Sequence, residues 1–105
     1  MRIADFGLAK PLLGRSAAYS FCGSPEYMAP EMLKKYITSY YRTGHGAALD
    51  YYCLGALLYE LVIGIPPYYS LDHEEIYQGV LFEELSFPEN AILSGEIKNI
   101  LSGLL

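Results

Sequence analysis

The sequence predicts a small, mainly α-helical fold in which a long loop precedes a group of helices. Three features indicate this: an apolar stretch over residues 49–63, two later segments with apolar residues at helical spacing, and a segment rich in Gly, Pro and Ser over residues 10–27. The chain has 105 residues, of which 52% are hydrophobic, so it can form the packed core of one small domain or of part of a larger one.

The N-terminal part is expected to be mostly loop. Residues 2–4 predict a single short strand that leads into Asp5. Residues 10–27 predict a surface loop, because turn-forming residues recur in them, at Pro11, Gly14, Gly23 and Pro25.

A short helix is predicted over Glu31–Lys35. Pro30 suits its first turn, where a proline has no amide hydrogen to leave unpaired. The β-branched and aromatic residues that follow predict a protruding loop over residues 36–46.

Leu49–Ile63 predicts the central helix, because it is apolar on every face except at Asp50 and Glu60. A helix of this kind is expected to be buried all round. Gly55 inside it predicts close packing, since a mid-helix glycine costs about 1 kcal/mol relative to alanine. Gly64, followed by two prolines, is expected to end the helix.

Two further helices are expected, one from Asp72 to about Phe82 and one that starts after Ser94. Aspartate and serine are both good N-cap residues. The apolar positions of these helices recur at helical spacing, at Ile76, Tyr77, Val80 and Leu81 in the first and at Ile97, Ile100, Leu101, Leu104 and Leu105 in the second.

Charge is distributed unevenly along the chain. Residues 1–49 hold six Lys or Arg and three Asp or Glu, a balance of +3, whereas residues 50–105 hold one Lys and nine Asp or Glu, a balance of −8. An acidic surface repels nucleic acid and anionic membranes and attracts basic peptides. It can equally be a solvated surface that keeps the protein soluble.

The cysteines, Cys22 and Cys53, form no Cys-x-x-Cys or Cys/His cluster, so neither a disulfide framework nor a zinc site is predicted. An intracellular, cytoplasmic location is therefore expected. Charged residues interrupt the N-terminus, so we expect no signal peptide. The longest apolar run, Tyr51–Tyr59, is too short to span a membrane.

Four motifs in one order resemble the activation segment of a protein kinase and the helix after it. They are Asp5-Phe6-Gly7, the segment Phe21–Tyr27, Ala29-Pro30-Glu31, and the segment Asp50–Gly55. The chain is most similar in these motifs to the basophilic Ser/Thr kinases of the AGC group, relatives of protein kinase A and Akt. The resemblance implies part of a kinase C-terminal lobe, with an activation segment over 1–31, a loop with an insertion over 32–48, and helices over 49–105.

The resemblance implies that Asp5 binds Mg²⁺, which in kinases bridges the phosphates of ATP. The alternative for Asp5 is a turn-capping aspartate. Phe6 is expected to pack inward and to help determine whether the kinase is in its active or its inactive state. Gly7 is expected to form the tight turn that follows Asp5 and Phe6.

The activation loop carries the implied regulatory positions. Ser20 matches the residue that receives an activating phosphate from an upstream kinase, with Lys10 as its basic partner, or it is an unmodified loop hydroxyl. Ser16 and Tyr19 are competing sites for the phosphate. Ser24 matches the hydroxyl that touches the catalytic aspartate. Cys22 is expected to be inert.

The implied substrate-binding residues fall into two groups. The resemblance implies that Phe21, Pro25 and Met28 form an apolar pocket for the substrate residue after the phosphoacceptor. It implies that Glu26, Tyr27 and Glu60 bind arginine from basic substrates. A carboxylate on an apolar helix is costly unless paired, which favours a function for Glu60. Glu31 and Asp50 are implied to be architectural.

These 105 residues contain no Gly-rich loop, no ATP-binding lysine strand and no His-Arg-Asp catalytic loop. We therefore expect a fragment of a Ser/Thr kinase that is inactive by itself. One alternative is a non-catalytic, pseudokinase-like or decoy module that binds basic peptides or kinase partners. Another is a chain without a stable fold of its own, since uncovered apolar helix faces favour aggregation.

Overall fold

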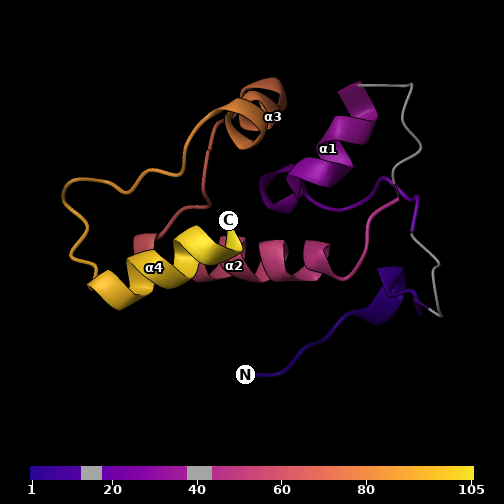
Figure 1. The fold of residues 1–105 in the computed structure, drawn as a ribbon, viewed down its shortest axis with the longest axis horizontal. Helices are drawn as coiled ribbons and strands as arrows, with labels where there is room; N and C mark the ends of the chain where they lie inside the picture. Colours follow the sequence, from indigo (N-terminus) through magenta and orange to yellow (C-terminus); the bar gives the residue numbers. More distant parts are fainter. Residues whose placement is uncertain (13–17, 38–43) are drawn as a thin grey trace.

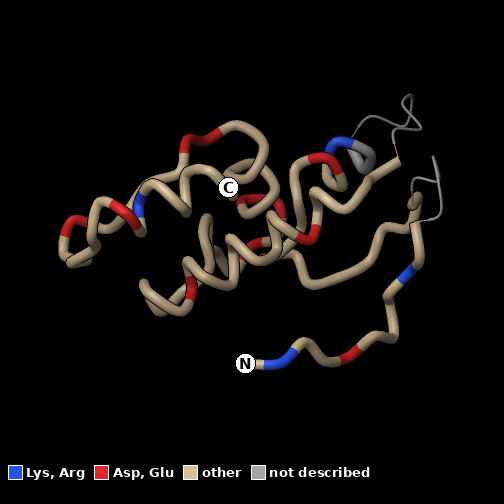
Figure 2. Tube along the Cα trace, turned by 60° about the horizontal axis from the view of Figure 1, so that its bottom comes forward, with Lys and Arg blue, Asp and Glu red and all other residues tan. Residues whose placement is uncertain are grey.

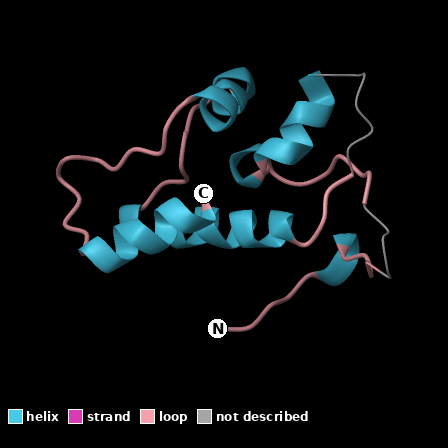
Figure 3. Ribbon diagram, in the orientation of Figure 1, coloured by secondary structure: helices cyan, strands magenta, loops and turns pink. Residues whose placement is uncertain are grey.

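The computed structural model describes residues 1–12, 18–37 and 44–105, with side chains of the first helix described through Lys34. The described residues form four α-helices: α1 (Pro30–Ile37), α2 (Ala48–Ile63), α3 (His73–Phe82) and α4 (Gly95–Leu104). Two short 3₁₀ turns precede them, η1 (Phe6–Leu8) and η2 (Pro25–Tyr27). The prediction of a mainly helical fold is confirmed (Figure 3).

The N-terminal segment lies outside the helical body. Residues 1–12 are all exposed, and the segment runs apart from the helices in Figure 1. The strand predicted over residues 2–4 is wrong. A strand needs a neighbour for its backbone hydrogen bonds, and the β pairing among the described residues is one isolated bridge, between Ala18 and His45.

Helix α1 begins at Pro30, one residue before the predicted Glu31, and ends at Ile37, two residues beyond the predicted Lys35. Met32 and Leu33 on this helix are buried. Residues 36 and 37 therefore belong to the helix and not to the loop that was predicted over residues 36–46. The middle of that loop lies outside the described residues.

Helix α2 is the central helix, but it is buried on one face and not all round. Its buried residues are Tyr52, Gly55, Ala56 and Tyr59, whereas Leu54 is 50% and Leu61 62% exposed. The elements that pack most extensively on α2 are α4 and η2, and they leave Leu54 and Leu61 exposed. Burial on every face, as the composition suggested, is thus wrong for this chain.

Gly55 allows α4 to approach α2 closely, as the sequence predicted. A Cβ atom at Gly55 would lie 2.8 Å from the Cβ of Leu104 and 3.0 Å from the side chain of Leu105. The C-terminus consequently lies beside α2 (Figure 1). Gly64 ends α2 with a left-handed backbone at φ 102°, which glycine adopts without strain.

The predicted caps of the last two helices are confirmed. The Asp72 side chain accepts a hydrogen bond from the Glu74 amide at 2.9 Å, and Ser94 Oγ accepts one from the Ile97 amide at 3.4 Å. Each cap satisfies one of the unpaired amides at a helix start.

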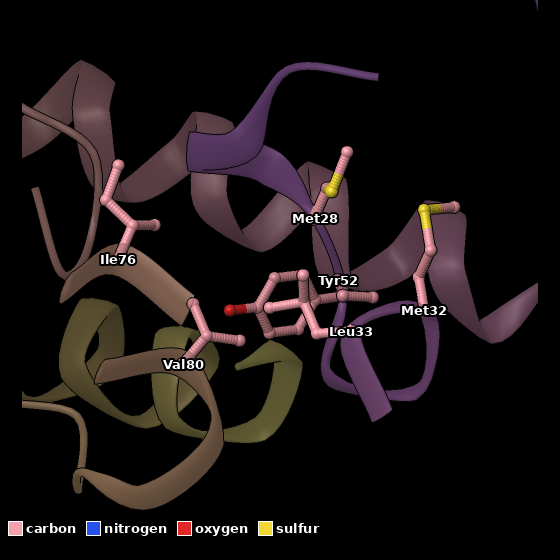
Figure 4. Packing of buried hydrophobic residues seen from close by; sticks show 7 residues of the cluster. Met28, Met32, Leu33, Tyr52, Ile76 and Val80 are labelled. Carbon is pink, nitrogen blue, oxygen red and sulfur yellow. The ribbon is translucent and has the colours of Figure 1, made fainter. Parts of the chain in front are cut away.

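The main core lies where α1, α2, α3 and η2 meet (Figure 4). Its buried members are Met28, Ala29, Met32, Leu33, Tyr52, Ile76 and Val80. No helix within the described ranges is long and apolar enough to cross a membrane.

Candidate functional site

The candidate site centres on a contact between the end of η2 and helix α2. The hydroxyl of Tyr27 donates a hydrogen bond to Oε2 of Glu60, across 33 residues of sequence. Two residues that the sequence assigned to the binding of basic substrates are thus brought together.

The local sequence explains how Tyr27 reaches α2. Pro25 occupies the first position of η2, where its fixed φ angle suits a helical turn. The Tyr27 amide donates to the Ser24 carbonyl at 3.1 Å, and the Met28 amide to the Pro25 carbonyl at 3.2 Å. This tight turn packs against α2.

A second contact fixes the backbone of Tyr27. The thiol of Cys53 on α2 lies 3.3 Å from the Tyr27 carbonyl oxygen and donates to it. Sequence reasoning considered Cys22 and gave Cys53 no role. The available signal was spacing: Cys53 and Glu60 are seven residues apart, about two helical turns, and therefore lie on the same side of α2.

The two donors, the Tyr27 hydroxyl and the Cys53 thiol, are both held in their protonated forms. The hydrogen bond to Glu60, then burial, then the charges of Glu60 and Glu26 raise the pKa of Tyr27 to about 12. Burial raises the pKa of the Cys53 thiol, and the charges of Asp50 and Glu31 add to this effect. At neutral pH both groups can donate. Glu60 retains acceptor capacity for a further donor, since a carboxylate has several lone-pair sites.

The other predicted substrate-binding residues divide into two environments. Phe21 is 41% exposed, and Pro25 and Glu26 are half-buried near the surface. Met28 is only 6% exposed and belongs to the main core. Its side chain packs the helices together, and its assignment to the apolar substrate pocket stays a prediction.

Asp5 lies in an exposed turn at the start of η1, with a left-handed backbone at φ 60° and ψ 72°. Gly7 follows it closely, since a Cβ there would lie 3.4 Å from Oδ1 of Asp5. Phe6 is 68% exposed, so the expected inward packing is wrong for this chain. The whole of the surrounding segment is exposed and buries none of its residues, which leaves the ring without an apolar site to enter.

The described residues do not form a metal site by themselves. They contain no group of three His, Cys, Asp or Glu side chains that could hold a metal ion. Asp5 offers one carboxylate, whereas Mg²⁺ takes near-octahedral oxygen coordination. A magnesium site at Asp5 would therefore need further oxygen ligands from phosphates, water or groups outside the described residues.

The predicted regulatory positions are exposed. Ser20 and Ser24 are accessible, and Ser20 lies two residues after the bridged Ala18. The Ser24 side chain does not cap η2. Lys10 is also exposed.

Asp50 and Glu31 stand in the first turns of α2 and α1 respectively. Carboxylates at these positions stabilise a helix through its dipole. Asp50 is exposed and Glu31 is half-buried.

The charges differ between the two ends of the chain. Figure 2 shows Asp and Glu residues distributed over the helical body, while Lys and Arg residues occur in the N-terminal segment and α1. Lys98 lies on α4. The surface around α2 and α3 therefore favours positively charged ligands.

The helical body, the long N-terminal segment and the turn η2 held against helix α2 fit part of a kinase C-terminal lobe. A comparison with family models supports this class: the model described as "Protein kinase domain" matches residues 1–105. The chain belongs to the protein kinase domain family.

The chain is similar over its whole length to longer kinases. The chain is 44% identical over 103 residues to protein kinase 2 of Dictyostelium discoideum, covering 98% of this chain and 20% of that protein. It is 41% identical over 106 residues to the RAC-beta serine/threonine-protein kinases of Homo sapiens and of Xenopus laevis, covering 100% of this chain and 20% of each relative. The chain thus spans about a fifth of the length of these relatives.

Proposed function

We propose that this chain is the substrate-binding and regulatory part of an ATP-dependent Ser/Thr protein kinase that phosphorylates basic protein substrates. The contact between Tyr27 and Glu60 carries the proposal. It places a carboxylate with remaining acceptor capacity beside the last part of the predicted activation segment, where an arginine of a substrate can bind it. The RAC-beta relatives are named as serine/threonine-protein kinases, which supports a serine or threonine hydroxyl of the substrate as the group that accepts the phosphate.

Asp5 is proposed as a magnesium ligand in the complete kinase. Its exposed carboxylate on a tight turn is of the oxygen type that Mg²⁺ prefers. Magnesium and ATP would supply the transferable phosphoryl group, and the groups that cradle ATP do not occur in these 105 residues. The chain alone is therefore expected to bind peptide and not to phosphorylate it.

Ser20 is proposed as the site at which an upstream kinase activates the protein. Its exposure makes the hydroxyl accessible, and a phosphate there would attract Lys10, which is exposed as well. The unpaired Cys22 and Cys53 agree with an intracellular location, in the cytoplasm, where ATP and upstream kinases are present.

Peptide binding tests the proposal directly. The 105-residue chain is titrated into a fluorescent peptide with arginines before a serine, and anisotropy gives the affinity at low and at moderate salt. Glu60→Gln is expected to weaken binding about tenfold, because a hydrogen bond to a charged group is lost. The matched control Glu89→Gln removes the same charge from an exposed loop and should change little.

Equal losses for the two variants would contradict the proposal, since they would reflect net charge and not a site. No binding to the arginine peptide at low salt would contradict it as well. The non-catalytic binding module is the second candidate, because the Tyr27–Glu60 contact forms within a chain that lacks the ATP-binding motifs. Phosphate transfer to a peptide by a longer protein that contains this chain would exclude the non-catalytic module.

A further inference from the structure

We infer that Cys53 is a positioning residue for the basic-peptide site, because its thiol fixes the Tyr27 backbone so that the Tyr27 hydroxyl reaches Glu60. This inference rests on the proposed function, since it gives Cys53 a role at the Glu60 site. Cys53 touches no substrate and acts through Tyr27.

The first argument is the hydrogen bonding at the end of η2. The Ser24 and Pro25 carbonyls accept the amides of Tyr27 and Met28, whereas the carbonyl of Tyr27 is at the end of the turn. Carbonyls at such ends have no partner within their own turn. The donor that the structure shows for this carbonyl is the Cys53 thiol, at 3.3 Å.

The second argument is the spacing of the two contacts along α2. Cys53 and Glu60 are separated by about two helical turns, so α2 holds Tyr27 at two separate points. One point fixes the backbone and the other fixes the end of the ring. Loss of the Cys53 contact would leave the Tyr27 backbone less firmly held against α2, and the phenol would then be less well positioned against the carboxylate.

The third argument is that the thiol keeps its proton. Cys53 is half-buried, and burial together with the nearby carboxylates of Asp50 and Glu31 raises its pKa. The group is therefore a thiol, which can donate, and not a thiolate, which cannot. Alkylation would remove this donor and add bulk between α2 and η2.

The experiment uses the full 105-residue chain with three variants. Cys53→Ala removes the donor, Cys53→Ser replaces it by a hydroxyl, and Ala56→Gly is the control. Ala56 is fully buried on the same helix and has no side-chain donor, so this control lowers stability without removing a hydrogen bond. Affinity for the arginine peptide is measured by anisotropy. Titration of the Tyr27 phenol is followed by NMR of ¹³Cζ-labelled tyrosine, with the signal assigned by its loss in Tyr27→Phe.

Cys53→Ala is expected to weaken binding of the arginine peptide about threefold, the size of effect for a lost S–H···O bond. It should also lower the pKa of Tyr27 from about 12 towards 10.0. Cys53→Ser should restore both, and Ala56→Gly should alter neither. Iodoacetamide treatment of a Cys22→Ser variant, in which Cys53 is the remaining thiol, should reproduce the loss.

Two results would overturn the inference: an unchanged affinity and Tyr27 titration in Cys53→Ala, or a failure of Cys53→Ser to restore them. The proposed function fails separately, if Glu60→Gln binds the arginine peptide as tightly as the parent chain. In that event the Tyr27 titration in Cys53→Ala and Cys53→Ser still decides whether Cys53 positions the ring.

Discussion

Tyr27 and Met28 are neighbours in the chain, yet they enter different environments. Tyr27 reaches Glu60 on α2 with its hydroxyl, while Met28 is buried among the helices. The resemblance to kinases implied substrate binding for both residues, and that role stays a prediction. It could not indicate which of the two is buried in the core, because the amount of burial at one position depends on the packing of distant helices.

The pH dependence of stability offers a test of the Tyr27–Glu60 contact. Folding raises the pKa of Tyr27 from 10.0 to about 12, so the protonated phenol is favoured in the folded chain. The stabilisation is full below pH 10 and is lost as the pH rises towards 12. We expect the melting temperature, followed by circular dichroism, to fall over this range.

Tyr27→Phe is the matched variant for this measurement. Other tyrosines, such as Tyr59 and Tyr68, also have raised pKa values and contribute to the fall in both proteins. The fall should be shallower in the variant, because it lacks the titrating hydroxyl. Identical slopes would mean that the contact adds nothing to the folded state.

At the scale of the elements, the local rules of helix formation were the most informative part of the sequence. Asp72, Ser94 and Gly64 marked helix ends within the chain, and each stands at the predicted boundary. The strand over residues 2–4 failed because a strand depends on a partner that the local sequence does not specify. The contact of Cys53 was missed for the same reason, since its partner lies 26 residues away.

Gly55 and Gly103 provide a pair of helical glycines with opposite expected effects. Gly55→Ala should destabilise the fold by about 1–3 kcal/mol, because its methyl group would collide with Leu104. Gly103→Ala meets nothing within 4 Å and should be neutral or stabilising by up to about 1 kcal/mol. Urea denaturation of the two variants measures the difference. Similar stabilities would show that α4 does not pack tightly on α2.

The caps of α3 and α4 make a further prediction at this scale. Asp72→Ala and Ser94→Ala should each lower the free energy of unfolding by about 1 kcal/mol, because each leaves a helix amide unpaired. Asp72→Asn keeps an acceptor and should cost less. Urea denaturation checks this order, and equal losses for Asp72→Ala and Asp72→Asn would exclude the capping explanation.

At the scale of the whole molecule, α2 combines a buried face with an exposed apolar face. Tyr51, Leu54 and Leu61 are each at least half exposed and recur at helical spacing along this outer face. The apolar composition of α2 predicted its central place, but not which side its neighbours would cover. The chain spans about a fifth of its relatives' length, and the exposure of this face holds for these 105 residues.

Such a face should cause the 105-residue chain to self-associate, because exposed apolar patches associate in water. We expect the sedimentation coefficient to rise with protein concentration. A double variant, Leu54→Lys with Leu61→Lys, should reduce this rise. The control pair Gln78→Lys with Asn99→Lys makes the same change of charge at exposed polar positions and should leave association nearly as strong. An equal effect of both pairs would attribute the change to charge alone.

The bridge between Ala18 and His45 joins the chain before η2 to the chain after α1. Two backbone hydrogen bonds, of 3.0 and 2.9 Å, pair these residues and so close the intervening chain into a ring that contains η2 and α1. Closing such a ring costs entropy that grows only with the logarithm of its length. Ser20 and Tyr27 both lie within this closed loop of chain. Breaking the Ala18–His45 hydrogen bonds would therefore give more conformational freedom to both residues at once.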